Sequence, residues 1–291
     1  MSGRSRIVQL LLMTKPKQLA LLMITMYGAY FIGGGGLDAR TLLLLTLTGI
    51  GSAGGVTALN MYLEVDIDRL MPRTRSRPLP SGSLSRREAL YGISGLILMG
   101  TLAGAFINKY VVLASLIGLY FDIIAYTEIA KRRTEWALLL GSVAGSMPAL
   151  GGWAAARASI DLLGIMLASI VYVWQPLHVA FIHYYYEDQY NGAGIPTIPS
   201  KLGSHAFAQL ALYSVTATIL LSWIVSVKLG GGFLSASIVT ILGFMALRVV
   251  SSFKRSPSKI LARNMIKFAS PLVGIIFILL PLEIHIINNI W

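Results

Sequence analysis

Long apolar segments alternate with short polar segments along almost the whole chain. Each apolar segment holds roughly 18 to 25 residues, which is the length that an α-helix needs to cross the hydrocarbon core of a bilayer. The pattern therefore predicts an all-α, polytopic membrane protein in which residues 1–291 form a single domain. Nine transmembrane helices are expected, at residues 18–36, 41–60, 89–107, 110–130, 136–156, 162–182, 206–227, 232–250 and 268–289.

The positive charges fall almost entirely on one side of this predicted topology. Of the 24 Lys and Arg residues, only four lie on the opposite side: Arg40, Lys109, Arg157 and Lys228. Cytoplasmic loops carry the excess of Lys and Arg in membrane proteins. The N-terminal segment 1–16 is therefore predicted to be cytoplasmic. With nine spans through the cell membrane, the C-terminus is then predicted to lie outside. The chemically rich loops at residues 61–88, 131–135 and 183–205 are then all cytoplasmic.

Composition and charge agree with a membrane protein and narrow its chemistry. The chain is 55% hydrophobic and 12% charged, whereas soluble domains carry about 25% charged residues. It has no Cys, which excludes disulfides, zinc thiolates, iron–sulfur clusters and Cys nucleophiles. The formal net charge of +12 is explained by the one-sided topology and by attraction to anionic lipids of the bilayer. No aromatic-and-basic module indicates nucleic acid as a partner.

The stretch NMYLEVDIDRLMPRTRSRP, residues 60–78, combines acidic residues and Arg directly after an apolar segment. Asn60, Glu64 and Asp68 are spaced four residues apart, so a continuing helix would carry them on one face. Mg²⁺ prefers oxygen ligands and accepts one or two carboxylates together with substrate phosphate. The spacing therefore predicts a Mg²⁺ site; the alternative is a charged interfacial loop that only sets the topology.

The Arg residues of the same loop suit a phosphate, because guanidinium groups bind phosphate oxygens in a bidentate manner. Acidic residues contribute little to topology, so the positive-inside rule leaves those of this loop unexplained. Together the acids and the Arg residues predict a site for a metal ion and a polyphosphate. The Arg residues concerned are Arg69, Arg73, Arg75 and Arg77.

The second loop, YTEIAKRRTEW at residues 126–136, is less specific. Lys131 and Arg132 cap the end of a predicted helix, where cations also suit the helix dipole. Topology and capping explain them on their own, and Tyr126 and Lys131 indicate a function only if this loop faces the first loop.

The third loop begins inside an apolar segment and carries unusual polar residues. The stretch WQPLHVAFIHYYYEDQYNGAGIP begins at Trp174 and includes His178 and His183. Polar groups inside a membrane are costly and indicate function by default, whereas a lone His is more often a hydrogen-bonded packing residue. Glu187 and Asp188 follow, and they could complete a second metal position.

Two apolar segments carry residues that shape the bundle. Gly141, Gly145 and Ala149 recur at a spacing of four, which lets a neighbouring helix approach closely. Pro148 and Pro176 each predict a kink or break in their helix.

The three loops together resemble the UbiA superfamily of intramembrane prenyltransferases, in the form typical of its protoheme IX farnesyltransferase branch. NMYLEVDIDRLMPRTRSRPLPSG is similar to the first Asp-rich motif of the superfamily. YTEIAKRRTEWALLLGSVAGSMPALGGWAA and WQPLHVAFIHYYYEDQYNGAGIP look like the next two conserved stretches of the branch, in the same order and spacing. The residues specific to the branch are Met71, Arg73, Thr74, Arg77 and Pro78.

Four departures from the family pattern are visible. Glu64 stands where the superfamily has Asp, so a longer side chain must reach the metal. The family's Trp–Gln–x–Pro–His reads Trp–Gln–Pro–Leu–His here, and Gln189 interrupts the usual Glu–Asp–Tyr. The second Asp-rich motif of quinone-type relatives is not intact, which favours heme over a phenolic acceptor and leaves the second metal position open.

The resemblance implies nine helices around a cavity that opens to lipid, with a polar cap on the cytoplasmic side. It implies a prenyltransferase that transfers a farnesyl or longer group from an isoprenyl diphosphate to a vinyl group of heme B. Water is added in the reaction, which gives heme O and diphosphate. A downstream heme A synthase is the implied protein partner.

The resemblance also implies roles for individual residues. The implied catalytic residues are Asn60, Glu64, Asp68, Lys131 and Asp188, of which Asn60, Glu64, Asp68 and Asp188 hold Mg²⁺. The implied diphosphate contacts are Arg69, Arg73, Arg77, Lys131 and Arg132. The implied heme contacts are Trp174, His178 and His183.

Two alternatives remain open. The chain could be a prenyltransferase of the same fold that acts on a quinone precursor or a glycerol phosphate lipid. From a different class, it could be a transporter of an anionic solute, which would need charges at several depths of the membrane. The charges here gather at one face, which favours the enzyme.

Overall fold

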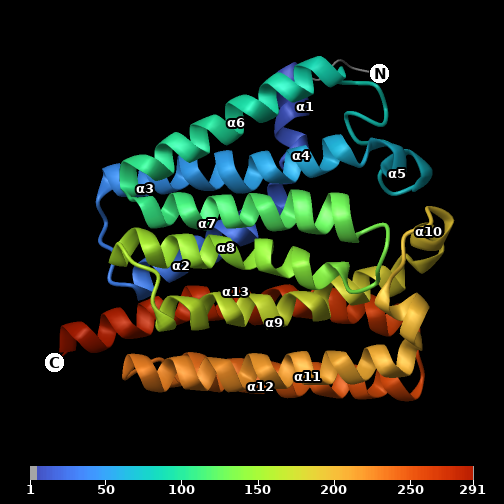
Figure 1. The fold of residues 1–291 in the computed structure, drawn as a ribbon. Helices are drawn as coiled ribbons and strands as arrows, with labels where there is room; N and C mark the ends of the chain where they lie inside the picture. Colours follow the sequence, from blue (N-terminus) through green and yellow to red (C-terminus); the bar gives the residue numbers. More distant parts are fainter. Residues whose placement is uncertain (1–4, 291) are drawn as a thin grey trace.

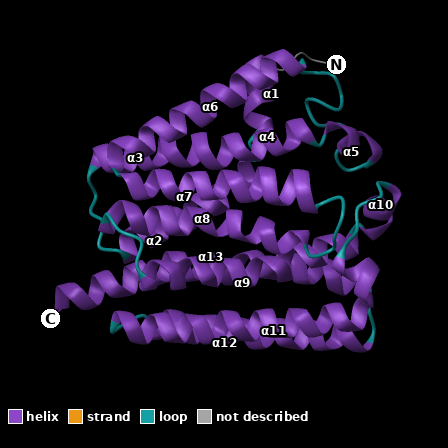
Figure 2. Cartoon of the chain, viewed as in Figure 1, coloured by secondary structure: helices purple, strands orange, loops and turns teal. Residues whose placement is uncertain are grey.

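The structure is a computed structural model that describes residues 5–290. All regular elements in this range are helices, and the long ones run side by side as a bundle with loops at its two ends (Figures 1 and 2). The all-α prediction is therefore confirmed. Arg4, which belongs to the predicted cytoplasmic segment, lies outside the described residues.

The elements follow one another with short connections, and two of them, η1 and η2, are π-helical. In a π-helix the backbone N–H groups bond five residues back instead of four. In chain order the elements are α1 (Arg6–Met13), α2 (Pro16–Ile32), α3 (Ala39–Thr48), η1 (Gly49–Gly54), α4 (Gly55–Leu63), α5 (Val65–Leu70), α6 (Arg86–Ile107), α7 (Lys109–Leu119), η2 (Tyr120–Ala130), α8 (Ala137–Arg157), α9 (Leu162–Tyr185), α10 (Glu187–Gly192), α11 (Ile198–Leu229), α12 (Phe233–Arg255) and α13 (Lys259–Ile290).

The first membrane span differs from the predicted segment 18–36. α1 and α2 meet at a bend of 56°, where Lys15 has a left-handed φ of 49° and Pro16 is the first residue of α2. Pro lacks an N–H and is favoured in the first turn of a helix, so Pro16 suits the start of a new helix after α1. Within the described residues, 8 helices are long and apolar enough to cross a membrane, or 9 if the bent pair is one span. The chain is a multi-pass membrane protein.

Close helix contacts hold the bundle together, because helices in lipid associate through tight packing more than through the hydrophobic effect. A Cβ on Gly51 of η1 would lie 2.4 Å from the backbone nitrogen of Gly100 in α6. A Cβ on Gly145 of α8 would lie 1.8 Å from Oε1 of Gln175 in α9. The close packing predicted at Gly145 is thus confirmed. α8 and α9 continue through Pro148 and Pro176, so neither helix is broken there, and a kink at these residues stays a prediction.

The arrangement leaves a cavity inside the bundle. Its lining comes from α2, α3, η1, α4, α5, α7, η2, α8, α9, α10 and α13. Within the described residues, α6, α11 and α12 contribute nothing to it, and Figure 1 places them at the two edges of the bundle. These three helices therefore support the helices that carry the site.

Candidate active site

The cavity, with a volume of about 560 Å³, receives side chains from all three polar loops. Volumes of about 300–1,000 Å³ are typical of small-molecule sites. Loops that lie far apart in the sequence therefore meet at one site. The charged lining residues that they supply are Glu64, Asp68, Arg73, Arg77 and Lys131.

Two ion pairs join the acids of the first loop to cations. Lys131 Nζ donates to Oε1 of Glu64, and the Arg77 guanidinium donates to both carboxylate oxygens of Asp68, at 2.8 and 2.7 Å. Glu64 and Asp68 are only 5% and 3% exposed. Buried charges need such partners, because the desolvation of an ion costs several kcal/mol. The second loop thus faces the first, which is the condition for Lys131 to join the phosphate site.

Lys131 is a charged ammonium group at the polar end of the cavity. It caps η2 and lies just beyond the membrane span Lys109–Ala130. Burial acts to lower its pKa, but the electrostatic interactions with Tyr126 and Glu64 and the hydrogen bond to Glu64 outweigh burial and raise the pKa above its ordinary value. Its positive charge is therefore retained at any physiological pH.

Asn60, Glu64 and Asp68 lie on two helices, so the prediction of one continuous helix is wrong. α4 ends at Leu63 and α5 begins at Val65, with Glu64 between them at φ −97° and ψ 15°. All three side chains nevertheless line the cavity. Asn60 Nδ2 donates to the Thr127 hydroxyl at 2.7 Å. Within the described residues, no donor forms a hydrogen bond to the Asn60 side-chain oxygen.

The oxygen atoms of these three residues suit a hard cation such as Mg²⁺. The described part of the chain contains no group of three or more His, Cys, Asp and Glu side chains that could hold a metal. Mg²⁺, however, keeps several waters and takes substrate phosphate as a ligand. Two carboxylates and one amide therefore fit it as a partial site that a diphosphate completes, provided that Lys131 and Arg77 release their carboxylates.

Three residues predicted to contact the metal or the diphosphate do not line the cavity. Arg132 forms an exposed bidentate pair with Asp66 at 2.8 and 2.9 Å, and this hydrogen bonding lowers the pKa of Asp66. Arg69 is exposed. Asp188 pairs with Lys259 at 2.6 Å, and its side chain is 82% exposed. The structure thus does not bring these side chains to the site.

Arg73 links the first loop to α10 of the third. Its backbone N–H donates to Oε1 of Gln189, and its guanidinium donates to the Tyr190 hydroxyl, both at 3.3 Å. The guanidinium carbon also lies 4.8 Å from the centre of the Tyr186 ring. These contacts hold Arg73 at the cavity, and its role as a diphosphate contact stays a prediction.

Trp174, His178 and His183 of α9 all line the cavity. Trp174 donates to the backbone oxygen of Ala269 at 2.8 Å, and its ring stacks on His178 with centroids 5.1 Å apart. The Nδ1 atoms of both histidines are buried and have no hydrogen-bond partner among the described residues. Buried polar atoms normally find a partner, so these two atoms point to a ligand.

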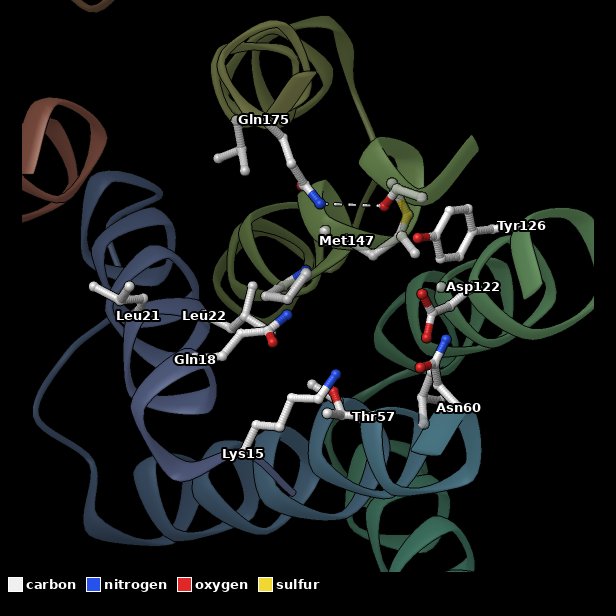
Figure 3. Close-up of a pocket in the computed structure, with 18 of the residues that line it drawn as sticks. Lys15, Gln18, Leu21, Leu22, Thr57, Asn60, Asp122, Tyr126, Met147 and Gln175 are labelled. Atoms are coloured by element: carbon white, nitrogen blue, oxygen red, sulfur yellow. Dashed lines mark hydrogen bonds between the residues drawn. The ribbon is translucent and has the colours of Figure 1, made fainter. Parts of the chain in front are cut away.

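Lys15 and Asp122 are charged residues of the site that carry no predicted role. Figure 3 shows their side chains directed into the cavity, with Asn60 beside Asp122. An acid within an apolar span is a signal that could have revealed Asp122. Lys15 looks in the sequence like any other cation that sets topology.

Comparison with known proteins supports a prenyltransferase. The chain matches the UbiA prenyltransferase family over residues 21–270. A protoheme IX farnesyltransferase of Aeropyrum pernix is 51% identical over 271 residues, which cover 93% of this chain and 90% of that protein. A protoheme IX farnesyltransferase of Korarchaeum cryptofilum is 41% identical over 281 residues, which cover 96% and 94%.

Solved structures share the fold. A structure of digeranylgeranylglyceryl phosphate synthase has a TM-score of 0.77 at 18% identity. The match covers 96% of this chain and 98% of the synthase chain. A UbiA homologue from Archaeoglobus fulgidus bound to GPP and Mg²⁺ has a TM-score of 0.69 at 15% identity, with coverages of 92% and 98%. At these identities the likeness concerns the fold alone. The resemblance predicted from the three loops is confirmed, and the chain belongs to the UbiA prenyltransferase family.

Proposed function

We propose that this prenyltransferase transfers a farnesyl or longer isoprenyl group from its diphosphate to a vinyl group of heme B. Water is added in the reaction, so the products are heme O and diphosphate. The observation that carries the proposal is one cavity that holds two features. One is a cluster of paired acids and cations, and the other is two buried His Nδ1 atoms that have no partner among the described residues. The names of the relatives support heme as the acceptor. The homologue bound to GPP and Mg²⁺ supports the donor.

The charged end of the cavity suits the diphosphate leaving group. Lys131, Arg77 and Arg73 can exchange their present partners for phosphate oxygens, which form strong charge-assisted hydrogen bonds. Cations positioned where negative charge develops lower the barrier as the C–O bond to the diphosphate breaks. Asn60 and the carboxylates of the two ion pairs would hold Mg²⁺, which supplies further positive charge to the leaving group.

The rest of the cavity suits the prenyl chain and its cation. Most of its lining there is apolar, with Leu22, Val56 and Met147 among its members, although Lys15 and Asp122 also line it. A dry apolar site protects the allylic cation from premature hydrolysis. The Tyr126 ring lies 5.1 Å from Lys131 Nζ, so it borders the carbon that carries the diphosphate and can stabilise positive charge there through its π face.

His178 and His183 are the proposed heme contacts. Replacing both by Ala should weaken heme binding by about tenfold or more. Each substitution removes a buried nitrogen that has no partner among the described residues and is proposed to contact heme. One such contact is worth about 1.5 kcal/mol or more. An optical titration of the purified protein with heme measures the affinity. His205→Ala is the matched control, because His205 is exposed on α11. Unchanged heme binding in the double variant would contradict the assignment.

Product analysis tests the proposed function directly. Membranes that contain the protein are incubated with heme B and either farnesyl or geranylgeranyl diphosphate, and the heme is examined by mass spectrometry. The expected product is heme that has gained one isoprenyl group and one hydroxyl, and the preferred donor gives the chain length. Prenylation of a quinone precursor in place of heme would reject the heme acceptor while leaving the family assignment intact.

The orientation in the membrane is also a proposal, with the N-terminus cytoplasmic and the C-terminus outside. The Lys and Arg asymmetry supports it, and Figure 1 places α5 and α10 at one end of the bundle and the end of α13 at the other. The chain has no Cys, so the variant Ser159→Cys carries a single thiol, between α8 and α9, and no other residue of the protein reacts with a thiol reagent. We expect a membrane-impermeant thiol reagent to label it from outside; labelling from the cytoplasmic side alone would reverse the orientation.

A further inference from the structure

Among the residues that the structure describes, Asp122 is the one carboxylate of the cavity that has no cationic partner in contact with it. The other two acids that line the cavity, Glu64 and Asp68, are each held by a cation. Within the described residues, the Asp122 side chain accepts no hydrogen bond and forms no salt bridge, although Lys15 and Lys131 act on it electrostatically at longer range. An unpaired acid inside a membrane span is costly and indicates a function.

The π-helical winding of η2 is what directs Asp122 to the site. Asp122 and Lys131 are nine residues apart, which in an α-helix is about two and a half turns, so the two side chains would point to opposite sides. The wider turn of η2 brings both of them, and Tyr126 between them, to the cavity. π-helical segments occur frequently at functional sites, and here the segment sets a cation and an acid along one wall.

The order of these residues along η2 places Asp122 beside the reacting carbons. Lys131 lies at the charged end, where the diphosphate is proposed to bind, and Asp122 lies further into the membrane span, beyond Tyr126. The allylic carbon is bonded to the diphosphate, so it must lie on the inner side of Lys131. In Figure 3, Asp122 lies beside Asn60 and faces the interior of the cavity. In the binding mode proposed above, a group at this position borders the bond that forms.

On the basis of the proposed function, we propose that Asp122 is the general base that accepts the proton of the water added to the prenylated heme. The C–O bond to the diphosphate breaks, and the terminal vinyl carbon of heme forms a C–C bond with the allylic carbon. Positive charge then rests on the vinyl carbon next to the porphyrin ring. The oxygen of water bonds to that carbon, and one proton of the water passes to the Asp122 carboxylate. The hydroxyl stays on the product, and the proton later leaves to solvent.

The test is the identity of the product made by Asp122→Asn, which keeps the shape of the side chain and removes its basicity. We expect the rate at which hydroxylated product forms to fall by about 100-fold, which is the low end of the rate loss that follows removal of a general base. Diphosphate release should continue. The cation formed by prenylation should then lose a proton from a carbon atom, so the heme should accumulate as a prenylated alkene that lacks the elements of water. Reaction in ¹⁸O-water identifies the added oxygen by mass. Asp122→Glu, which keeps the base, should restore hydroxylated product.

Each other outcome has a defined meaning. Hydroxylated product at the rate of the unsubstituted protein in Asp122→Asn would overturn the role of Asp122. Loss of isoprenyl diphosphate binding in both Asp122→Asn and Asp122→Glu would also overturn it, because the residue would then act in folding or in donor binding. If the unsubstituted protein makes no prenylated heme at all, the proposed function itself fails, and the role of Asp122 fails with it.

Discussion

Replacing Asp68 by Asn should lower the rate of prenyl transfer by about 100-fold or more, which is the usual effect of removing one group that stabilises the charge of a transition state. Asp68 is buried and accepts both hydrogen bonds from Arg77. Asn offers a weaker oxygen ligand to Mg²⁺ and cannot neutralise Arg77 in the free enzyme. The measurement is kcat per mole of folded protein. It is obtained from the release of diphosphate from the isoprenyl diphosphate substrate in the presence of heme and Mg²⁺.

Asp66→Asn is the matched control for this substitution. Asp66 lies two positions away on the same short helix, α5, but it is exposed and pairs with Arg132 outside the cavity. An exposed pair of this kind contributes only about 0.2–1 kcal/mol to stability, so activity should stay close to that of the unsubstituted protein. The breaking of a buried pair can also destabilise the fold. A lower folded yield of Asp68→Asn with unchanged kcat would therefore assign Asp68 a structural role only.

The long spans could be predicted from the sequence because the bilayer fixes the length of an apolar helix. The segment 110–130 corresponds to Lys109–Ala130 in the structure. The first span is less predictable, because its apolar residues begin in α1 and are interrupted at Lys15 and Pro16. Hydropathy does not register a bend of this kind, which depends on the backbone conformation of two residues.

Spacing along the sequence identified the residues of the acidic cluster but not their geometry. The four-residue interval assumes one regular helix, whereas the chain turns at Glu64. The same assumption places Asp122 and Lys131 on opposite faces of a helix, and only the π-helical winding of η2 unites them. A deviation from 3.6 residues per turn depends on packing against neighbouring helices, so a periodicity argument cannot supply it.

Membership in a charged loop does not tell which of its side chains reach the cavity. Asp66 and Asp68 are two residues apart on α5, yet one is exposed and the other is buried. Asp188 lies one residue from Glu187 at the start of α10, and its carboxylate points away to Lys259. Which way a short helix faces is decided by the tertiary contacts that anchor it, such as those between Arg73 and Tyr190.

Binding of Mg²⁺ and of diphosphate should each strengthen the other by about tenfold or more, which corresponds to about 1.4 kcal/mol of coupling. In the free enzyme, Glu64 and Asp68 are neutralised by Lys131 and Arg77. If Mg²⁺ alone bound the two carboxylates, Lys131 and Arg77 would be left buried without partners. If diphosphate alone bound these two cations, the carboxylates would be left buried without partners. Unpaired buried charges are strongly unfavourable, so the two ligands stabilise the opened site together. Thermodynamic linkage requires that the two enhancement factors be equal.

Calorimetric titrations measure the coupling without turnover. Mg²⁺ is titrated into the purified protein with and without inorganic diphosphate, and diphosphate is titrated with and without Mg²⁺, each corrected for the binding of Mg²⁺ to diphosphate in solution. Lys131→Gln frees Glu64, so it should strengthen the binding of Mg²⁺ alone and reduce the enhancement that diphosphate brings. Arg132→Gln, next along the chain but paired outside the cavity, should leave both unchanged. Affinities for Mg²⁺ that do not depend on diphosphate would show that the two ion pairs remain closed when the ligands bind.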